Sequence, residues 1–274
     1  LGKGGMGEVR KIRDRELNRS LAMKIIHEDL LSKTNAVARF IEEGQVGAQL
    51  QHPNIVPIHE MGRLEDGRLY FTMKEIRGRE FTESITAVHG AVRNNRWWPT
   101  EDGWNFRRLI DVFHKVCSAM AYAHSKGVVH RDLKPENIMI GSFGEVLVVD
   151  WGIAKVIGRP DYAAEAGELD VVVTDRSEEG HFATRVGQVA GTPAYMAPEQ
   201  ARGEVHSIDA RTDVYTLGAI LYELLTGRCP YMGSSAMHVL RQVLTGPPAS
   251  VRSQSLTKSD NISLPFDSSE DASV

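Results

Sequence analysis

Two short segments, residues 130–137 (HRDLKPEN) and residues 150–152 (DWG), constrain this chain more than any other feature. Together they supply two aspartates, a lysine and an asparagine on neighbouring predicted loops. Phosphoryl transfer needs such a set: an acid that orients the attacking hydroxyl, a cation for the moving phosphate, and oxygen ligands for magnesium. The letters HRD alone recur by chance, whereas eight consecutive residues at a fixed spacing from a second motif do not. The pattern therefore indicates chemistry on phosphoryl groups.

Composition excludes several classes of protein. At 274 residues with 42% hydrophobic residues, the chain can bury a sizeable core in two lobes or one large domain. A net charge of −4 gives no basic field, so we expect no nucleic-acid partner. Cys117 and Cys229 lie far apart and outside any CxxC motif, which predicts free thiols in a reducing compartment. The histidines form no metal-ligand motif, so zinc is not expected.

Hydropathy gives no sign of a membrane-spanning segment. No apolar run reaches the roughly 18–20 residues that cross a bilayer, so we expect no membrane segment in this chain. The chain begins at Leu1, inside what reads as a strand–loop motif, and we interpret it as a fragment. We therefore expect a cytoplasmic location for this portion, with any membrane anchor of the parent protein in other regions.

The hydrophobic pattern changes along the chain. Residues 1–74 read as strands around one helix, whereas residues 79–249 are mainly helical. The clearest helical face precedes the HRD segment and consists of Phe106, Leu109, Ile110, Phe113, Cys117 and Met120. Residues 250–274 are rich in serine and aperiodic, which predicts a disordered tail. The sequence therefore predicts an α+β fold with a β-rich N-lobe, a mostly helical C-lobe and a cleft between the two lobes.

The first residues fit a phosphate-binding loop. Gly2, Gly4, Gly7 and Val9 match G-x-G-x-x-G-x-V, in which glycines let backbone N–H groups approach phosphates closely. The same glycine spacing occurs in dinucleotide-binding loops, but those open a helix, and here a second strand follows. Lys24 lies fifteen residues after Val9 in an apolar strand. We predict that Lys24 anchors a phosphate rather than lying on an exposed strand edge.

A buried lysine that anchors a phosphate needs a carboxylate to hold it in place. Glu43 and Glu42 are the candidates on the following predicted helix, and adjacent helical residues point about 100° apart. Glu43 shares the face of Phe40 and Leu50. We therefore favour Glu43 as the partner, with Glu42 as a solvated surface charge.

These motifs, together with residues 191–199 (GTPAYMAPE), resemble the eukaryotic-type, or Hanks-type, serine/threonine protein kinases, most closely the bacterial members. The resemblance covers about residues 1–248 and implies ATP as the phosphoryl donor and Mg²⁺ as cofactor, with Mn²⁺ as an alternative. It implies that Asp132 orients or deprotonates the substrate hydroxyl and that Lys134 neutralises the γ-phosphate. Asn137 and Asp150 would bind the metal. Lys24 and Glu43 would form the ion pair on the phosphates.

The resemblance also implies the rest of the nucleotide site and a protein-docking surface. Val9, Ala22 and Met139 would enclose the adenine, with Met73 behind it. The hinge between the lobes would lie at about residues 74–78 and include Lys74, Glu75 and Ile76. In segment 191–199, Thr192 would bond to the catalytic loop and Glu199 would help to build the surface for protein substrates. Asp213 would brace the catalytic loop through backbone N–H groups.

Arg131 implies regulation. In the family, an arginine before the catalytic aspartate indicates control by phosphorylation of the activation loop, because a phosphate there pairs with the guanidinium. Thr184 is the best candidate acceptor, with Thr174 and Ser177 as alternatives, and self-phosphorylation is possible. Ordinary loop hydroxyls without a regulatory role are the other interpretation.

Some positions depart from the family pattern. Trp151 replaces the usual Phe, and Gly47 replaces a larger residue, so we predict that Trp151 fills the space over Gly47. The family's later C-terminal helices are missing, which predicts that Glu199 lacks its arginine partner and is left unpaired. Residues 86–104 carry three tryptophans, which indicate either local packing or a partner-binding patch.

The resemblance implies a serine/threonine kinase that acts on protein substrates, since Lys134 within DLKPEN is typical of serine/threonine kinases and the docking segment is typical of kinases that act on proteins. Two alternatives stay open. The truncation favours a pseudokinase or scaffold that binds nucleotide or partners without turnover. A small-molecule phosphotransferase shares the Asp and Asn but lacks the segment at 191–199.

Overall fold

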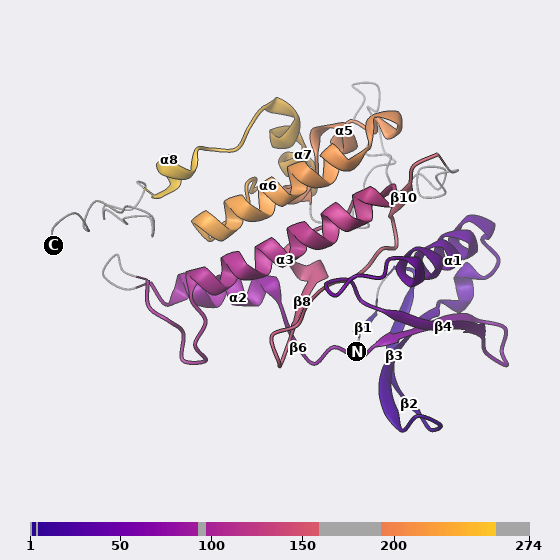
Figure 1. Cartoon of the computed structure of the whole chain (residues 1–274). Helices are drawn as coiled ribbons and strands as arrows, with labels where there is room; N and C mark the ends of the chain where they lie inside the picture. The colour runs from indigo at the N-terminus through magenta and orange to yellow at the C-terminus, as the bar shows by residue number, and fades with distance from the viewer. Residues whose placement is uncertain (1, 4, 93–96, 159–192, 256–274) are drawn as a thin grey trace.

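The N-terminal part of the chain is a twisted antiparallel sheet with one long helix. In this computed structural model, residues 2–3, 5–92, 97–158 and 193–255 are described. Within them, a five-stranded sheet has the order β1-β2-β3-β5-β4. Its strands are β1 (Gly2–Lys3), β2 (Gly7–Asp14), β3 (Arg19–Ile26), β4 (Ile58–Arg63) and β5 (Leu69–Lys74). The helix α1 (Thr34–Gln49) lies against this sheet (Figure 1).

An apolar contact layer joins α1 to the sheet. Phe40 on α1 and Phe71 on β5 are both almost fully buried, with ring centroids 5.2 Å apart. The two glycines of α1 allow strand β4 to lie close to the helix. A Cβ added to Gly44 would lie 2.0 Å from Met61 Cε, and one added to Gly47 would lie 2.5 Å from Ile58 Cδ1. Small residues on α1 therefore accommodate large side chains from β4.

The prediction that Trp151 fills the space over Gly47 is wrong. Within 4 Å of a Cβ built on Gly47, the neighbouring atoms come from Ile58 of β4. Trp151 is buried elsewhere, against His130 of the catalytic loop, with ring centroids 4.6 Å apart. The reason is geometric, because Gly47 faces the sheet of its own lobe and not the DWG segment.

Residues 75–77 connect the five-stranded sheet to the second part of the molecule. There, β6 (Gly78–Glu80), β8 (Ile138–Gly141) and β9 (Val146–Val148) form a three-stranded antiparallel sheet. A further antiparallel pair joins β7 (Val128–Val129) to β10 (Lys155–Val156). The segments that carry HRDLKPEN and DWG thus lie between short paired strands, which fix where each loop begins and ends.

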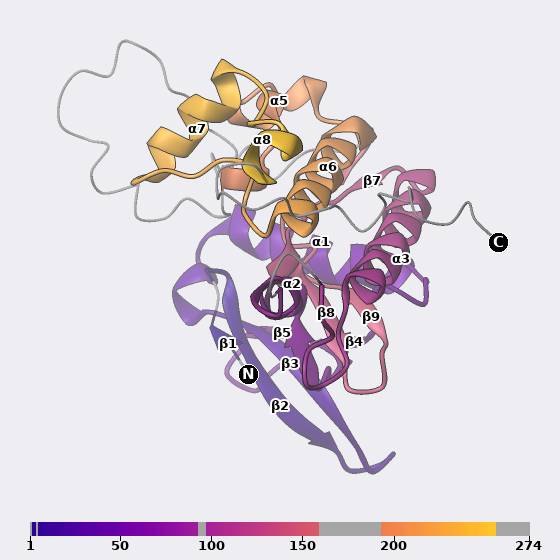
Figure 2. The ribbon, with the colours of Figure 1, turned by 90° about the vertical axis from the view of Figure 1, so that its left-hand side faces the viewer.

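The second part of the molecule is otherwise helical (Figure 2). Its helices are α2 (Phe81–Gly90), α3 (Phe106–Ser125), α5 (Pro198–Ala201), α6 (Ala210–Thr226), α7 (Ala236–Thr245) and α8 (Val251–Ser255). Helices α3 and α6 lie side by side in Figure 1 and contact each other. The predicted α+β fold of a β-rich part followed by a helical part is therefore correct. Helix α8 lies inside the segment for which we expected a disordered tail, and residues 256–274 lie outside the described residues.

The inward face of α3 differs in part from the predicted one. Leu109 and Met120 are fully buried as expected, but Val112 and Val116 complete the buried stripe. Ile110, Phe113 and Cys117 are only partly buried at its margin. Apolar residues flank both sides of the true face, so the periodicity alone did not fix the rotation of the helix.

Two of the three tryptophans in residues 86–104 pack locally, whereas Trp98 is 53% exposed. Trp97 contacts His89 and Phe106, with ring centroids 4.9 and 5.1 Å away. Trp104 is 2% exposed and lies under the guanidinium groups of Arg79 and Arg108.

None of the helices in the described part of the chain combines the length and the apolar character of a membrane-spanning helix.

Candidate active site

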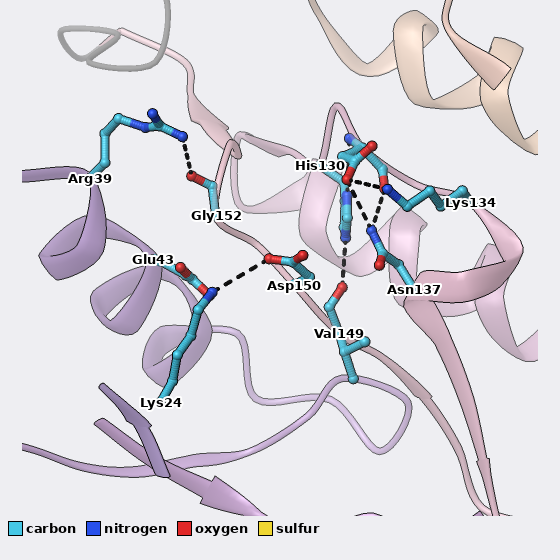
Figure 3. Close-up of polar contacts among 10 residues, drawn as sticks. Lys24, Arg39, Glu43, His130, Lys134, Asn137, Val149, Asp150 and Gly152 are labelled. Atoms are coloured by element: carbon cyan, nitrogen blue, oxygen red, sulfur yellow. Dashed lines mark hydrogen bonds and ion pairs between the residues drawn. The ribbon is translucent and has the colours of Figure 1, made fainter. Parts of the chain in front are cut away.

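The site begins with an ion pair between the two central elements of the N-terminal part (Figure 3). Lys24 Nζ on β3 lies 2.5 Å from Glu43 Oε1 on α1, so Glu43 and not Glu42 is the partner. The same ammonium group lies 3.7 Å from Asp150 Oδ1, which follows β9 in the second part of the molecule. Lys24 therefore links both parts of the chain at one point.

Electrostatics favour the charged forms of Lys24 and Asp150. Burial alone would lower the pKa of Lys24, but Glu43 and Asp150 outweigh it and raise that pKa. Desolvation would raise the pKa of Asp150, but the nearby Lys24, His130 and Lys134 bring it below its usual range. The Asp150 side chain is 50% exposed, so an ionised carboxylate remains available to a ligand.

The catalytic-loop side chains converge on Asp132. Lys134 Nζ donates to Asp132 Oδ2 at 2.9 Å. The amide nitrogen of Asn137 donates to the Asp132 carbonyl at 2.7 Å and to its carboxylate at 3.2 Å. Because Pro135–Asn137 is one turn of 3-10 helix, it brings Asn137 back toward Asp132. The arrangement presents a carboxylate, an ammonium group and an amide oxygen on one loop.

Asp213 anchors the backbone of this loop. It is fully buried on α6 and accepts hydrogen bonds from the backbone N–H groups of His130 (2.9 Å) and Arg131 (3.0 Å). A third contact, with His124 Nε2 at 2.7 Å, comes from the end of α3. Arg131 has a φ of +68°, a costly conformation for a residue with a side chain. The fixed carboxylate stabilises the backbone in that conformation.

The DWG segment is tied to the same loop. The backbone N–H of Val149 donates to the Asn137 carbonyl at 2.9 Å, so the two proposed metal ligands, Asn137 and Asp150, lie on adjoining backbone. His130 Nδ1 accepts from the Asp132 N–H, which leaves Nε2–H to donate to the Val149 carbonyl at 3.2 Å. Asp150 itself has a φ of +62°, a second left-handed residue beside the site.

Most of the predicted nucleotide-binding residues lie along one face of the five-stranded sheet. Directly paired residues of antiparallel strands share a face. Val9 pairs with Lys24, and Ala22 pairs with Met73, which places Val9 and Ala22 on the face that carries the Lys24 ammonium group. Met139 lies on β8 of the second part, opposite Glu80. Gly7 has to be a glycine, because a Cβ there would lie 2.2 Å from the Ile25 carbonyl oxygen.

The hinge residues follow directly after β5. Lys74 ends the strand, and Glu75 and Ile76 lie in the connection to β6. The Glu75 carboxylate contacts Lys11 and Arg77, at 2.6 and 3.1 Å. Gly2 lies in β1 opposite Val9, and Gly4 lies outside the described residues.

The donor set fits a magnesium ion that shares its ligands with phosphates. In the described ranges, no group of three or more His, Cys, Asp or Glu side chains could hold a metal ion. Mg²⁺ is typically held by one or two carboxylates together with phosphates and waters. Asp150 presents a half-exposed carboxylate, and Asn137 commits its amide nitrogen to Asp132, which leaves the amide oxygen for a ligand. These two residues would hold the metal.

Two of the predicted functional residues fall within residues 159–192. Thr184 and Thr192 lie outside the described residues, so the structure says nothing about their contacts. Glu199 lies on α5 and is only partly buried, and it accepts a hydrogen bond from Thr212 Oγ1 at 2.7 Å. The prediction of an unpaired buried carboxylate is therefore wrong, because Glu199 is partly exposed and the Thr212 hydroxyl of α6 donates to it.

Two residues of the site went unnoticed in the sequence. Arg39 on α1 is 3% exposed and donates to the Gly152 carbonyl at 3.4 Å, which ties α1 to the DWG segment. His124 shares Asp213 with the catalytic loop. Arg39 precedes Glu43 by one helical turn, and this spacing could have indicated that both side chains face the site.

The Arg131 side chain extends toward the segment after DWG. Its guanidinium donates to the carbonyls of Ile153 (2.5 Å) and Ala154 (3.1 Å). Lys155, the next residue, donates to the carbonyls of Val205 (2.7 Å) and Ile208 (3.2 Å). Arg39 and Arg131 thus contact backbone oxygens of residues 152–154, and Lys155 joins the end of this stretch to the carbonyls of Val205 and Ile208.

Comparison with known proteins agrees with this geometry. A family model described as "Protein kinase domain" matches residues 1–272. The serine/threonine-protein kinase PknD of Protochlamydia amoebophila (strain UWE25) is 42% identical over 233 residues, 84% of this chain and 23% of its own length. The serine/threonine-protein kinase pkn3 of Myxococcus xanthus is 36% identical over 252 residues, 90% of this chain and 40% of its own length.

A third relative, the serine/threonine-protein kinase PknD of Chlamydia trachomatis serovar L2b, is 36% identical over 250 residues, 90% of this chain and 26% of its own length. The chain therefore spans less than half the length of each of these curated relatives. The family model covers nearly the whole chain, and the Lys24–Glu43 pair, the loop around Asp132 and the brace at Asp213 lie within it. The chain belongs to the protein kinase family, as a Hanks-type serine/threonine protein kinase domain.

Proposed function

We propose that this chain transfers the γ-phosphate of ATP to serine and threonine hydroxyls of protein substrates. The observation that supports this most strongly is the position of Lys24, whose ammonium group contacts Glu43 of one part of the chain and Asp150 of the other. A cation held in this way suits the phosphates of a nucleotide bound between the two parts. The cofactor would be Mg²⁺, with Mn²⁺ as an alternative.

Each side chain has a separate task in this proposal. Asp132 accepts a hydrogen bond from the substrate hydroxyl and orients it, and Lys134, 2.9 Å away, balances charge on the transferred phosphoryl group. Lys24 positions the α- and β-phosphates. Asn137 and Asp150 would hold Mg²⁺, which when bound would neutralise part of the phosphate charge. Val9, Ala22, Met73 and Met139 surround the base.

Removing Lys24 tests the proposal at its strongest point. In Lys24→Met, phosphate transfer from radiolabelled ATP to a generic protein substrate should fall by about 10²–10³-fold, because one fixed charge on the phosphates is lost. Lys115→Met, an exposed lysine on α3, should transfer at the wild-type rate. Circular dichroism would verify that both variants are folded. Equal rates in wild type and Lys24→Met would contradict the assigned role.

Regulation by phosphorylation of the activation segment is part of the proposal. Arg131 directs its guanidinium at the backbone oxygens of Ile153 and Ala154, where that segment begins, and Arg39 and Lys155 lie on neighbouring elements. A phosphate on Thr184 could pair with these cations and order the segment. We place the activity in the cytoplasm and expect the chain to phosphorylate itself.

Mass spectrometry tests this regulation. After incubation with Mg²⁺ and ATP, the wild type should carry phosphate between residues 155 and 190, foremost on Thr184. Asp132→Asn should carry none, which shows that the phosphate comes from the chain itself. No phosphate in the wild-type segment would contradict self-phosphorylation there.

A further inference from the structure

Two linked ion pairs, here called the ionic chain, lie at the connection between the two parts of the molecule and consist of Lys11, Glu75 and Arg77. Lys11 Nζ on β2 lies 2.6 Å from Glu75 Oε1, and Arg77 lies 3.1 Å from the other oxygen of the same carboxylate. The Glu75 side chain is only 8% exposed although it lies in a connecting segment. Its pKa is held below the usual range, foremost by the hydrogen bond from Lys11 and then by that from Arg77. Glu75 is therefore a fixed anion at this junction.

Lys11 lies on the same face of the sheet as the predicted nucleotide-binding residues. Side chains alternate along a strand, so Lys11 shares a face with Val9, two residues away on β2. Lys11 pairs with Ala22, as Val9 pairs with Lys24. The ion pair between Lys11 and Glu75 therefore lies at the end of that face and joins β2 to the segment that follows β5.

The other end of the ionic chain is anchored in the second part of the molecule. The Arg77 carbonyl accepts hydrogen bonds from Ser142 N at 2.8 Å and from Ser142 Oγ at 2.7 Å, in the turn between β8 and β9. A parallel tie joins Lys74 Nζ to Glu145 Oε1 at 3.4 Å in the same turn. Glu75 thus connects β2 to a segment that is itself fixed to the C-lobe.

We propose that Lys11 and Glu75 are positioning residues that hold strand β2 against the connecting segment and so slow the release of nucleotide. Because Val9 lies on the same strand and face, any movement of β2 away from Glu75 carries Val9 away from the base. The proposal rests on the proposed function, since it assumes a nucleotide under Val9 and Ala22. It assigns Lys11 and Glu75 a role in affinity and none in phosphate transfer itself.

The chain provides a matched control on the same strand. Arg10, the neighbour of Lys11, is similarly exposed (55% against 50% of the side chain) and forms an ion pair with Glu8 at 2.5 Å. It projects from the opposite face of β2, away from Glu75. Lys11→Met and Arg10→Met therefore each remove one ion pair from one strand, but only Lys11→Met releases β2 from the connecting segment.

Two measurements test the proposal. Titration calorimetry gives the affinity for Mg·ADP, and stopped-flow displacement gives the rate at which ADP is released. Lys11→Met should bind about two- to fivefold more weakly and release ADP faster by the same factor, as expected for a partly exposed ion pair. Glu75→Gln should lose as much or more, and the double variant should match Glu75→Gln, because both changes break the same contact. At 1 M NaCl the difference between wild type and Lys11→Met should shrink.

Arg10→Met separates this role from a general effect on stability. Lys11→Met and Arg10→Met should shift the thermal unfolding midpoint of the nucleotide-free protein by similar small amounts. Arg10→Met should nevertheless retain the wild-type affinity for Mg·ADP. Wild-type affinity and release in Lys11→Met, or an equal loss in Arg10→Met, would overturn the proposal. If the wild type bound no Mg·ADP, the proposed function would fail, and the positioning role with it.

Discussion

Glycines in α1 illustrate how single residues decide packing in this molecule. Gly44 and Gly47 each cost helix stability, about 0.5–1 kcal/mol relative to alanine. They are compensated by close contact with β4, where Met61 and Ile58 occupy the space that a side chain on α1 would need. The position of α1, and with it the position of Glu43, therefore depends on two residues without side chains.

At Gly47, a larger side chain should collide with Ile58. Gly47→Leu should lower the free energy of unfolding by about 1–3 kcal/mol, the usual cost of overpacking. Adding Ile58→Ala should recover at least half of that loss, because it removes the colliding atoms. Urea unfolding followed by circular dichroism measures both values.

Gly218 is the matched control for this test. It lies inside α6 and is exposed, and a Cβ there would meet no heavy atom within 4 Å. Gly218→Leu should therefore stabilise the protein by about 0.5–1 kcal/mol through helix propensity alone. Recovery of Gly47→Leu by Trp151→Ala, and not by Ile58→Ala, would instead support packing against Trp151.

Helices of the C-lobe are joined by polar contacts as well as by their apolar faces. His89 at the end of α2 contacts the Leu224 carbonyl of α6 through Nε2 at 2.9 Å, and its ring meets that of Trp97 edge to face. Burial lowers the pKa of His89 below its usual value. The neutral ring, with a proton on Nε2, is therefore the form that joins the two helices.

The contact between His89 and the Leu224 carbonyl predicts that the stability of the protein depends on pH. Because the folded state binds a proton on His89 more weakly than the unfolded state, its stabilising contribution is complete above about pH 6.5 and declines as the pH falls through the lowered pKa. Between pH 7.5 and pH 5.5, His89→Gln should lose less unfolding free energy than the wild type. Urea unfolding at both pH values provides the comparison, and equal losses in the two proteins would contradict it.

Across the whole molecule, the polar site was more predictable than the packing around it. Asp132, Lys134 and Asn137 lie within six residues, so local sequence determines much of their geometry. The partners of Gly47 and Glu199 come from β4 and α6, and such contacts depend on which elements meet in the fold. The sequence therefore predicted that the polar side chains of residues 132–137 lie together, and it failed on these two long-range contacts.

The choice of Glu43 over Glu42 concerns a long-range contact that the sequence nevertheless predicted. The helical face of Phe40 and Leu50 was enough to select Glu43, because a buried face determines the direction of every residue on it. On α3 the same reasoning left the rotation of the helix partly wrong, since Ile110 and Phe113 extend the apolar surface beyond the buried stripe. Periodicity is thus informative where the apolar face is narrow.

In the proposed mechanism, Asp132 orients a serine or threonine hydroxyl for attack on ATP. The most direct measurement is transfer of radiolabel from ATP to protein, followed by analysis of the phosphorylated amino acids. The wild type should yield phosphoserine and phosphothreonine, and Asp132→Asn should be slower by about 10²–10⁴-fold with unchanged Mg·ADP affinity. Asp111→Asn, an exposed aspartate on α3, should behave as the wild type. Equal transfer by the wild type and Asp132→Asn would contradict the account.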